Sequence, residues 1–144
     1  MNILDISILA FVIMETANVI ILYFKPEFRY GNGVAIFNEW EKSKEDETVH
    51  LFAKYMANWV AGVKLIFIVL LLVIMLTCEN TTKAWAVGVM ILSIASYFWK
   101  LHPIIKKLDE KNMITPKGYS KTLGKMIAGF MIMFSVALIL YFII

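Results

Sequence analysis

Four runs of apolar residues, each about as long as a membrane-spanning helix, dominate this sequence. They cover roughly residues 3–24, 58–78, 84–101 and 123–144. A hydrocarbon core about 30 Å thick needs roughly 20 apolar helical residues, so each run is close to the length required. The sequence therefore predicts an all-α polytopic membrane protein, a single domain of four transmembrane helices in an antiparallel bundle. Because proline disfavours helix at and before its own position, Pro103 after His102 predicts the end of the third helix, the alternative being a kink that lets the helix continue to Ile105.

The composition agrees with this assignment and excludes several other classes of protein. Of the 144 residues, 60% are hydrophobic and 17% are charged, whereas a soluble domain is about 45–50% apolar and about 25% charged. A chain this short has no soluble core large enough for that excess. A disordered chain, a disulfide-framed secreted module and a water-soluble enzyme domain are excluded. The single cysteine, Cys78, permits no intrachain disulfide.

The first apolar run is expected to remain in the mature protein. A secretory signal peptide begins with a basic region and ends in a small-residue cleavage site. This run lacks a basic leading region, carries Asp5 near its start and is interrupted by Glu15 and Asn18.

The basic residues predict the orientation of the chain in a cell membrane. Lys and Arg gather in the two long connections, about residues 25–57 and 102–122, and neither end of the chain carries any. The positive-inside rule then places both connections in the cytoplasm and both termini outside. The second connection forms a basic surface with Lys106, Lys107, Lys111, Lys117 and Lys121. These lysines suit anionic lipid headgroups or an acidic partner, although topology alone also accounts for them, and no nucleic-acid partner is predicted.

The first connection contains its own helical pattern. After a turn at residues 30–33, Val34, Phe37 and Trp40 recur at helical spacing, which predicts a short interfacial helix with Phe37 and Trp40 directed toward lipid. Asp46 or Thr48 is then expected to cap a helix that continues into the second span. Ser120 or Thr122 is expected to cap the fourth in the same way.

Polar residues inside the apolar runs predict a cluster within the membrane. At 1.5 Å per residue, Glu15 lies roughly 18 Å and Lys64 roughly 21 Å from the outer surface. Because a buried charge needs a partner and hydrogen bonds, we expect Glu15 and Lys64 to pair, with Asn18 one turn from Glu15. The third run adds candidates at similar depth, and helix two adds a polar stripe: Ser96, Tyr97, Lys100, Asn58 and Lys54. The cluster is interpreted as structural, as a solute or proton pathway, or as a ligand pocket.

The sequence favours a non-enzymatic function through helix-mediated assembly, as an oligomer or a subunit of a larger membrane complex. Small residues four apart, such as Ala57 and Ala61, let membrane helices approach closely. The alternative is a small transporter or channel with Glu15 as a proton or cation site. A second alternative is a lipid-modifying enzyme that uses residues of the predicted cytoplasmic surface, namely His102, Tyr119, Asp109 and Glu110. No catalytic residue, cofactor or metal site is predicted.

Overall fold

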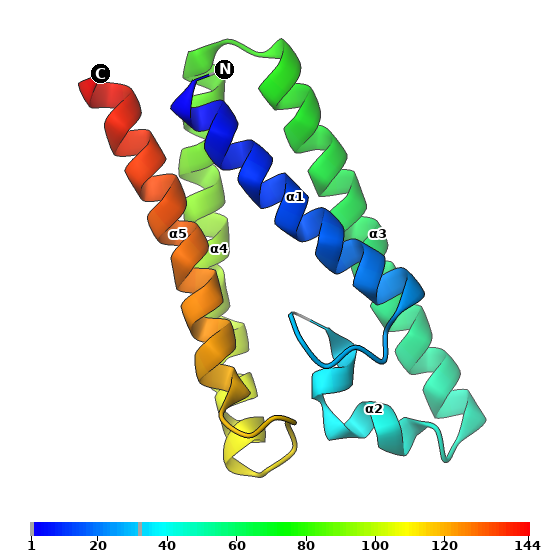
Figure 1. The fold of residues 1–144 in the computed structure, drawn as a ribbon. Coiled ribbons are helices and arrows are strands. Elements are labelled where there is room, and N and C mark those ends of the chain that lie inside the picture. The colour runs from blue at the N-terminus through cyan, green and yellow to red at the C-terminus, as the bar shows by residue number, and fades with distance from the viewer. Residues whose placement is uncertain (1, 32) are drawn as a thin grey trace.

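The computed structural model describes residues 2–31 and 33–144, and these residues form an all-helical structure (Figure 1). The elements in chain order are α1 (Ile3–Phe24), the 3-10 helix η1 (Val34–Ile36), α2 (Asn38–Ser43), α3 (Glu47–Thr77), α4 (Asn80–Glu110) and α5 (Tyr119–Ile143). Helices α1, α3, α4 and α5 are long and apolar enough to cross a membrane. The predicted fold class is thereby confirmed, and the chain fits a multi-pass membrane protein.

Helix α1 is the centre of the arrangement. It packs along α3 on one side and against α5 and α4 on the other, while α4 and α5 form an antiparallel pair. Helix α3 makes little direct contact with α4, and the two diverge toward the end of the molecule that carries α2 (Figure 1). We call this the loop end. Both chain termini lie at the opposite end, the termini end (Figure 1).

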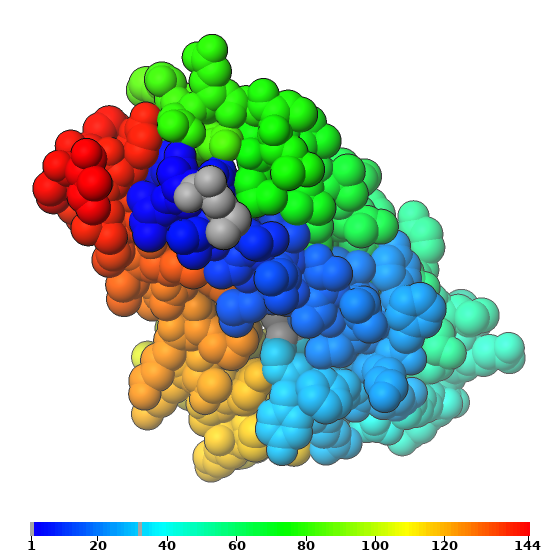
Figure 2. Space-filling model, turned by 45° about the horizontal axis from the view of Figure 1, so that its top comes forward, coloured from blue at the N-terminus to red at the C-terminus, as the bar shows by residue number. Residues whose placement is uncertain are grey.

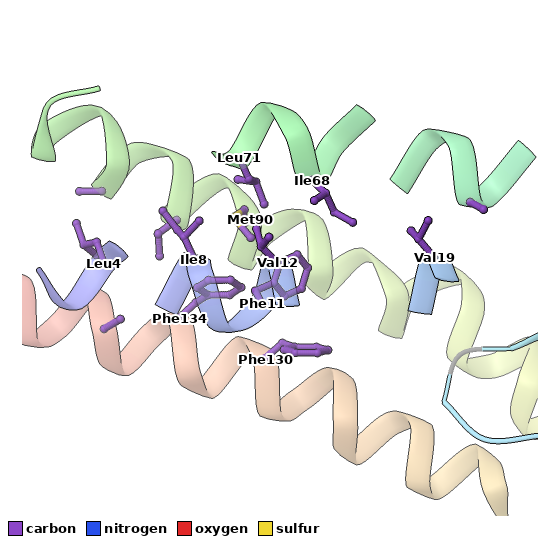
Figure 3. Close-up of a cluster of buried hydrophobic side chains, with 14 of the residues drawn as sticks. Leu4, Ile8, Phe11, Val12, Val19, Ile68, Leu71, Met90, Phe130 and Phe134 are labelled. Atoms are coloured by element: carbon purple, nitrogen blue, oxygen red, sulfur yellow. The ribbon is translucent and has the colours of Figure 1, made fainter. Parts of the chain in front are cut away.

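The main core is built around aromatic side chains of α1 and α5 (Figure 3). The ring centroid of Phe11 lies 5.0 Å from that of Phe130 and 5.3 Å from that of Phe134. Phe11 also meets Phe67 of α3 edge to face at 6.1 Å. Because lipid tails are as apolar as these side chains, close packing rather than release of water stabilises such contacts in a membrane.

The sequence predicts that the third apolar helix ends near Pro103. In the structure, α4 instead continues to Glu110 with the proline inside it. Proline removes one backbone hydrogen bond from a helix interior, so the extension needs support from elsewhere. Beyond the proline, Ile105 is buried in a second hydrophobic cluster, whose other buried members are Ile36, Ile114, Tyr119 and Leu123. Tertiary packing thus outweighs the local preference of the proline.

The start of α3 agrees with the prediction, whereas the start of α5 does not. Asp46 caps α3, and its Oδ1 accepts hydrogen bonds from the backbone N–H groups of Thr48 at 2.9 Å and Val49 at 3.1 Å. Helix α5 instead follows Gly118, which has a φ of 84°, and is capped from another helix. The carboxylate of Asp109 in α4 accepts from the backbone of Gly118 at 2.7 Å and of Ser120 at 3.0 Å.

The first connection is helical where the sequence predicts, but in two pieces, η1 and α2, separated at Phe37, and its aromatic residues are placed differently. Helix α2 begins at Asn38, and Trp40 is only 4% exposed. The indole of Trp40 packs on the ring of His50, with 5.1 Å between centroids. The expectation that Trp40 reaches toward lipid was therefore wrong, because α2 turns this face toward α3.

The two long connections bind one another at the loop end. Backbone hydrogen bonds run from Asn38 N–H to the Met113 carbonyl at 2.9 Å and from Thr115 N–H to the Ile36 carbonyl at 2.8 Å. Figure 2 shows the first connection lying beside the start of α5. These bonds tie the α1–α3 pair to the α4–α5 pair where the helices diverge.

Candidate functional site

Three of the predicted polar residues meet between α1 and α3. The ammonium group of Lys64 donates to Glu15 Oε2 at 2.8 Å and to Asn18 Oδ1 at 2.6 Å. The side chains of Lys64 and Glu15 are 21% and 17% exposed, and Asn18 is buried. We call Glu15, Asn18 and Lys64 the polar centre.

Helical spacing and small residues together build the polar centre. Glu15 and Asn18 are three positions apart, so both side chains leave the same face of α1. On α3, Ala57 and Ala61 are buried about two turns and one turn before Lys64, respectively. Because an alanine lets two membrane helices approach closely, these residues bring Lys64 within reach of α1.

The charges of the polar centre cancel within it. One carboxylate and one ammonium group are in contact, and the amide of Asn18 accepts a second hydrogen bond from the same ammonium group. A charge in the hydrocarbon region normally faces a partner or a hydrated cavity. The arrangement therefore suits a structural joint between α1 and α3, and replacement of either charged residue alone leaves the other without its counter-ion.

A small cavity of about 190 Å³ lies on the other side of Glu15, between α1 and α5. Glu15 and Asn18 line it from α1, Gly31 lines it from the first connection, and Leu123 and Phe130 line it from α5. Sites for organic ligands usually measure about 300–1,000 Å³, whereas a water molecule occupies about 30 Å³. The cavity therefore suits several waters or a small cation rather than an organic solute.

Gly31 and Tyr119 hold the first connection against this cavity. The hydroxyl of Tyr119 donates to the Gly31 carbonyl at 3.0 Å. Gly31 has a φ of 73°, and a Cβ at this position would lie 3.9 Å from Nδ2 of Asn18. A glycine is favoured here because other residues rarely adopt a positive φ. The sequence predicts only a turn at Gly31 and a surface position for Tyr119, and the contact between them is visible only in the structure.

The structure does not bring the other predicted members into the polar centre. Ser96 donates to the Ser93 carbonyl at 2.6 Å, and Lys100 lies 4.7 Å above the ring of Trp99. Both are exposed, as are Asn58 and Lys54 on α3. The Tyr97 hydroxyl instead lies 3.4 Å from Nδ1 of His102. The prediction grouped these residues because they lie at similar depth in the membrane. Depth does not determine the direction in which a side chain leaves its helix.

A second ion pair, which was not predicted from the sequence, joins α1 to α4 at the termini end. Lys83 Nζ lies 2.7 Å from Asp5 Oδ1, and the two side chains are only 10% and 11% exposed. Beside this pair, Asn2 Nδ2 donates to Asn80 Oδ1 at 2.7 Å. The signal was present in the sequence, because Asp5 and Lys83 each lie in the first turn of a helix at the same predicted membrane surface.

The residues of the predicted basic surface separate into two groups. Lys106, Lys117 and Lys121 line a cavity of about 590 Å³ between the end of α4 and the start of α5. His102, Asp109 and Glu110 also line this cavity. Lys107 and Lys111 are exposed and lie outside the lining. Asp109 and Tyr119, considered above for lipid chemistry, already make structural hydrogen bonds to the start of α5 and to Gly31.

An ion-pair network stabilises the first connection. Its residues lie outside the four helices that could span a membrane. Lys44 Nζ lies 2.7 Å from Glu27 Oε2 and 3.1 Å from Glu41 Oε2. The hydrogen bond from Lys44 holds the pKa of Glu27 below its usual value. The same contact, with that to Glu41, raises the pKa of Lys44. Because these side chains are well exposed, solvent screening keeps their contribution to stability small.

Comparison of this chain with protein-family models, with curated proteins and with solved structures finds no match.

Proposed function

We propose that this chain is a small, non-enzymatic membrane protein that works through lateral association of its helices, as an oligomer or as a subunit of a larger membrane complex. The observation that carries the proposal is the placement of α3. This helix packs along α1 with one face and makes little contact with α4, so most of its apolar side chains have no partner within the described chain.

The outward face of α3 suits another helix. Its large exposed side chains include Val63, Ile66, Val69, Leu70 and Val73. Lipid tails also cover such a face, but membrane helices gain stability by interdigitating side chains with one another. The polar centre supports the same proposal. Glu15 and Lys64 are paired with each other, so neither charge is free to bind a solute or a proton.

Energy transfer between labelled chains in liposomes tests this proposal. Cys78 is the single cysteine and is partly exposed, so donor and acceptor dyes can be attached there. We expect transfer above the random-collision value that persists when lipid is added in excess. Ile66→Trp, on the outward face of α3, should reduce it several-fold, whereas the matched change Ile132→Trp on α5 should not. Transfer at the random value, together with a single chain and no bound partner in mild detergent, would refute the proposal.

The second candidate is a transporter or channel for protons or a small cation, and the cavity beside Glu15 favours it. The carboxylate lies between Lys64 and a space large enough for several waters. In this case, Glu15→Gln should abolish ion flux into liposomes while the helical content and association state survive. Flux that is absent from the unmodified chain, or unchanged in the variant, argues against this function.

A further inference from the structure

We propose that the cavity between α4 and α5 at the loop end is a binding site for the headgroup of an anionic phospholipid. Its volume of about 590 Å³ falls within the usual range for ligand sites, about 300–1,000 Å³. Lysines reach it from three places: Lys106 from α4, Lys117 from the second connection and Lys121 from α5. A phosphate in the cavity would therefore meet cations on several sides.

The two carboxylates of the lining leave these lysines available. Asp109 is buried, and its oxygens already accept hydrogen bonds from Gly118 N–H, Ser120 N–H and the Ser120 hydroxyl. Glu110 is well exposed and lies 3.9 Å from Lys106, at the limit of an ion pair. Three ammonium groups and two carboxylates thus line the cavity, which leaves one net positive charge, and this charge favours an anion.

The position of the cavity favours a lipid over a soluble anion. It lies where α4 and α5 leave their apolar segments, since Leu123, two residues after Lys121, is already buried in the hydrophobic cluster. His102 also lines the cavity. Its ring lies so close to Gly124 that a Cβ there would be 3.0 Å from His102 Cε1. A headgroup held by the lysines would leave its acyl chains beside the apolar faces of the two helices.

The remaining lysines of this region provide a matched control. Lys107, Lys111 and Lys125 are exposed and do not line the cavity. General attraction between a basic surface and anionic lipid depends on net charge near the membrane. Loss of three lysines therefore has the same effect in either group if attraction is general, and different effects if the cavity is a site.

The experiment uses the full chain in nanodiscs of phosphatidylcholine with a small fraction of phosphatidylglycerol, and native mass spectrometry counts the retained lipids. The cavity variant is Lys106→Gln/Lys117→Gln/Lys121→Gln, and the control is Lys107→Gln/Lys111→Gln/Lys125→Gln. We expect the unmodified chain and the control to retain phosphatidylglycerol over phosphatidylcholine, and the cavity variant to lose affinity about tenfold or more. Circular dichroism and size-exclusion chromatography check folding. The single changes Lys121→Gln and Lys125→Gln repeat the comparison if a triple variant misfolds.

Three results would overturn the proposal. Equal losses in the two variants would show general attraction to an anionic surface. Failure of the unmodified chain to prefer phosphatidylglycerol would show that the cavity holds no lipid. Inorganic phosphate or glycerol 3-phosphate that binds to the cavity lysines, with no retained phosphatidylglycerol, would assign the site to a soluble anion.

Discussion

Replacement of Glu15 and Lys64, singly and together, tests whether the polar centre holds α1 to α3. At the observed 2.8 Å, Coulomb's law with an effective dielectric constant of about 20 gives a gross attraction of about 6 kcal/mol. Desolvation of both groups offsets most of this attraction. Measured interactions between polar groups of membrane helices are about 0.6–1.7 kcal/mol. We therefore expect a coupling free energy of about 1–2 kcal/mol.

The two single variants should differ. In Glu15→Gln, Lys64 keeps Asn18 as an acceptor, so we expect a loss of about 1–2 kcal/mol in the free energy of unfolding. In Lys64→Met, the Glu15 carboxylate loses its ammonium partner, and we expect about 2–3 kcal/mol. The double variant Glu15→Gln/Lys64→Met should be more stable than the sum of the two losses predicts, and more stable than Lys64→Met alone.

Unfolding by sodium dodecyl sulfate in mixed micelles, followed by circular dichroism, measures all four free energies. The control is the cycle Glu39→Gln/Lys42→Met, because that pair lies 3.4 Å apart with side chains 45% and 65% exposed. Its coupling should be below about 0.5 kcal/mol. If the losses at Glu15 and Lys64 simply add, the two residues do not act as a pair and the reasoning fails.

Further predictions concern the other contacts that join the helices. Lys83→Met should destabilise the chain by about 1–3 kcal/mol, more than the exposed Lys42→Met, in the same unfolding assay. Tyr119→Phe removes the hydrogen bond to Gly31 and should speed hydrogen exchange of residues 33–37 several-fold, with little change in α3. Acidification should loosen the first connection. Because the pKa of Glu27 is lowered in the folded chain, its stabilising contribution is present above its unfolded pKa, about 4.5, and is lost as the pH falls through the folded value. Proteolysis of this connection should lose that part of its pH dependence in Glu27→Gln.

The polar centre shows which parts of the site could be predicted from the sequence and which could not. Hydropathy located the four apolar helices, and a rise of 1.5 Å per residue placed Glu15 and Lys64 at similar depth. The same count placed Ser96, Tyr97 and Lys100 there, and these residues lie elsewhere. Depth follows from position along one helix. The direction of a side chain relative to a neighbouring helix depends on how the two helices pack.

Sequence alone determined the properties that depend on local composition: the all-helical class, the four apolar helices and the start of α3, where Asp46 was one of two predicted caps. Only the tertiary structure decided that α4 continues through Pro103, that Asp109 caps α5, and that Tyr119 holds Gly31. The physical reason is that each of these outcomes depends on a contact between segments far apart in the chain. Packing of Ile105 offsets a local cost at Pro103, and no pattern within one helix records that contact.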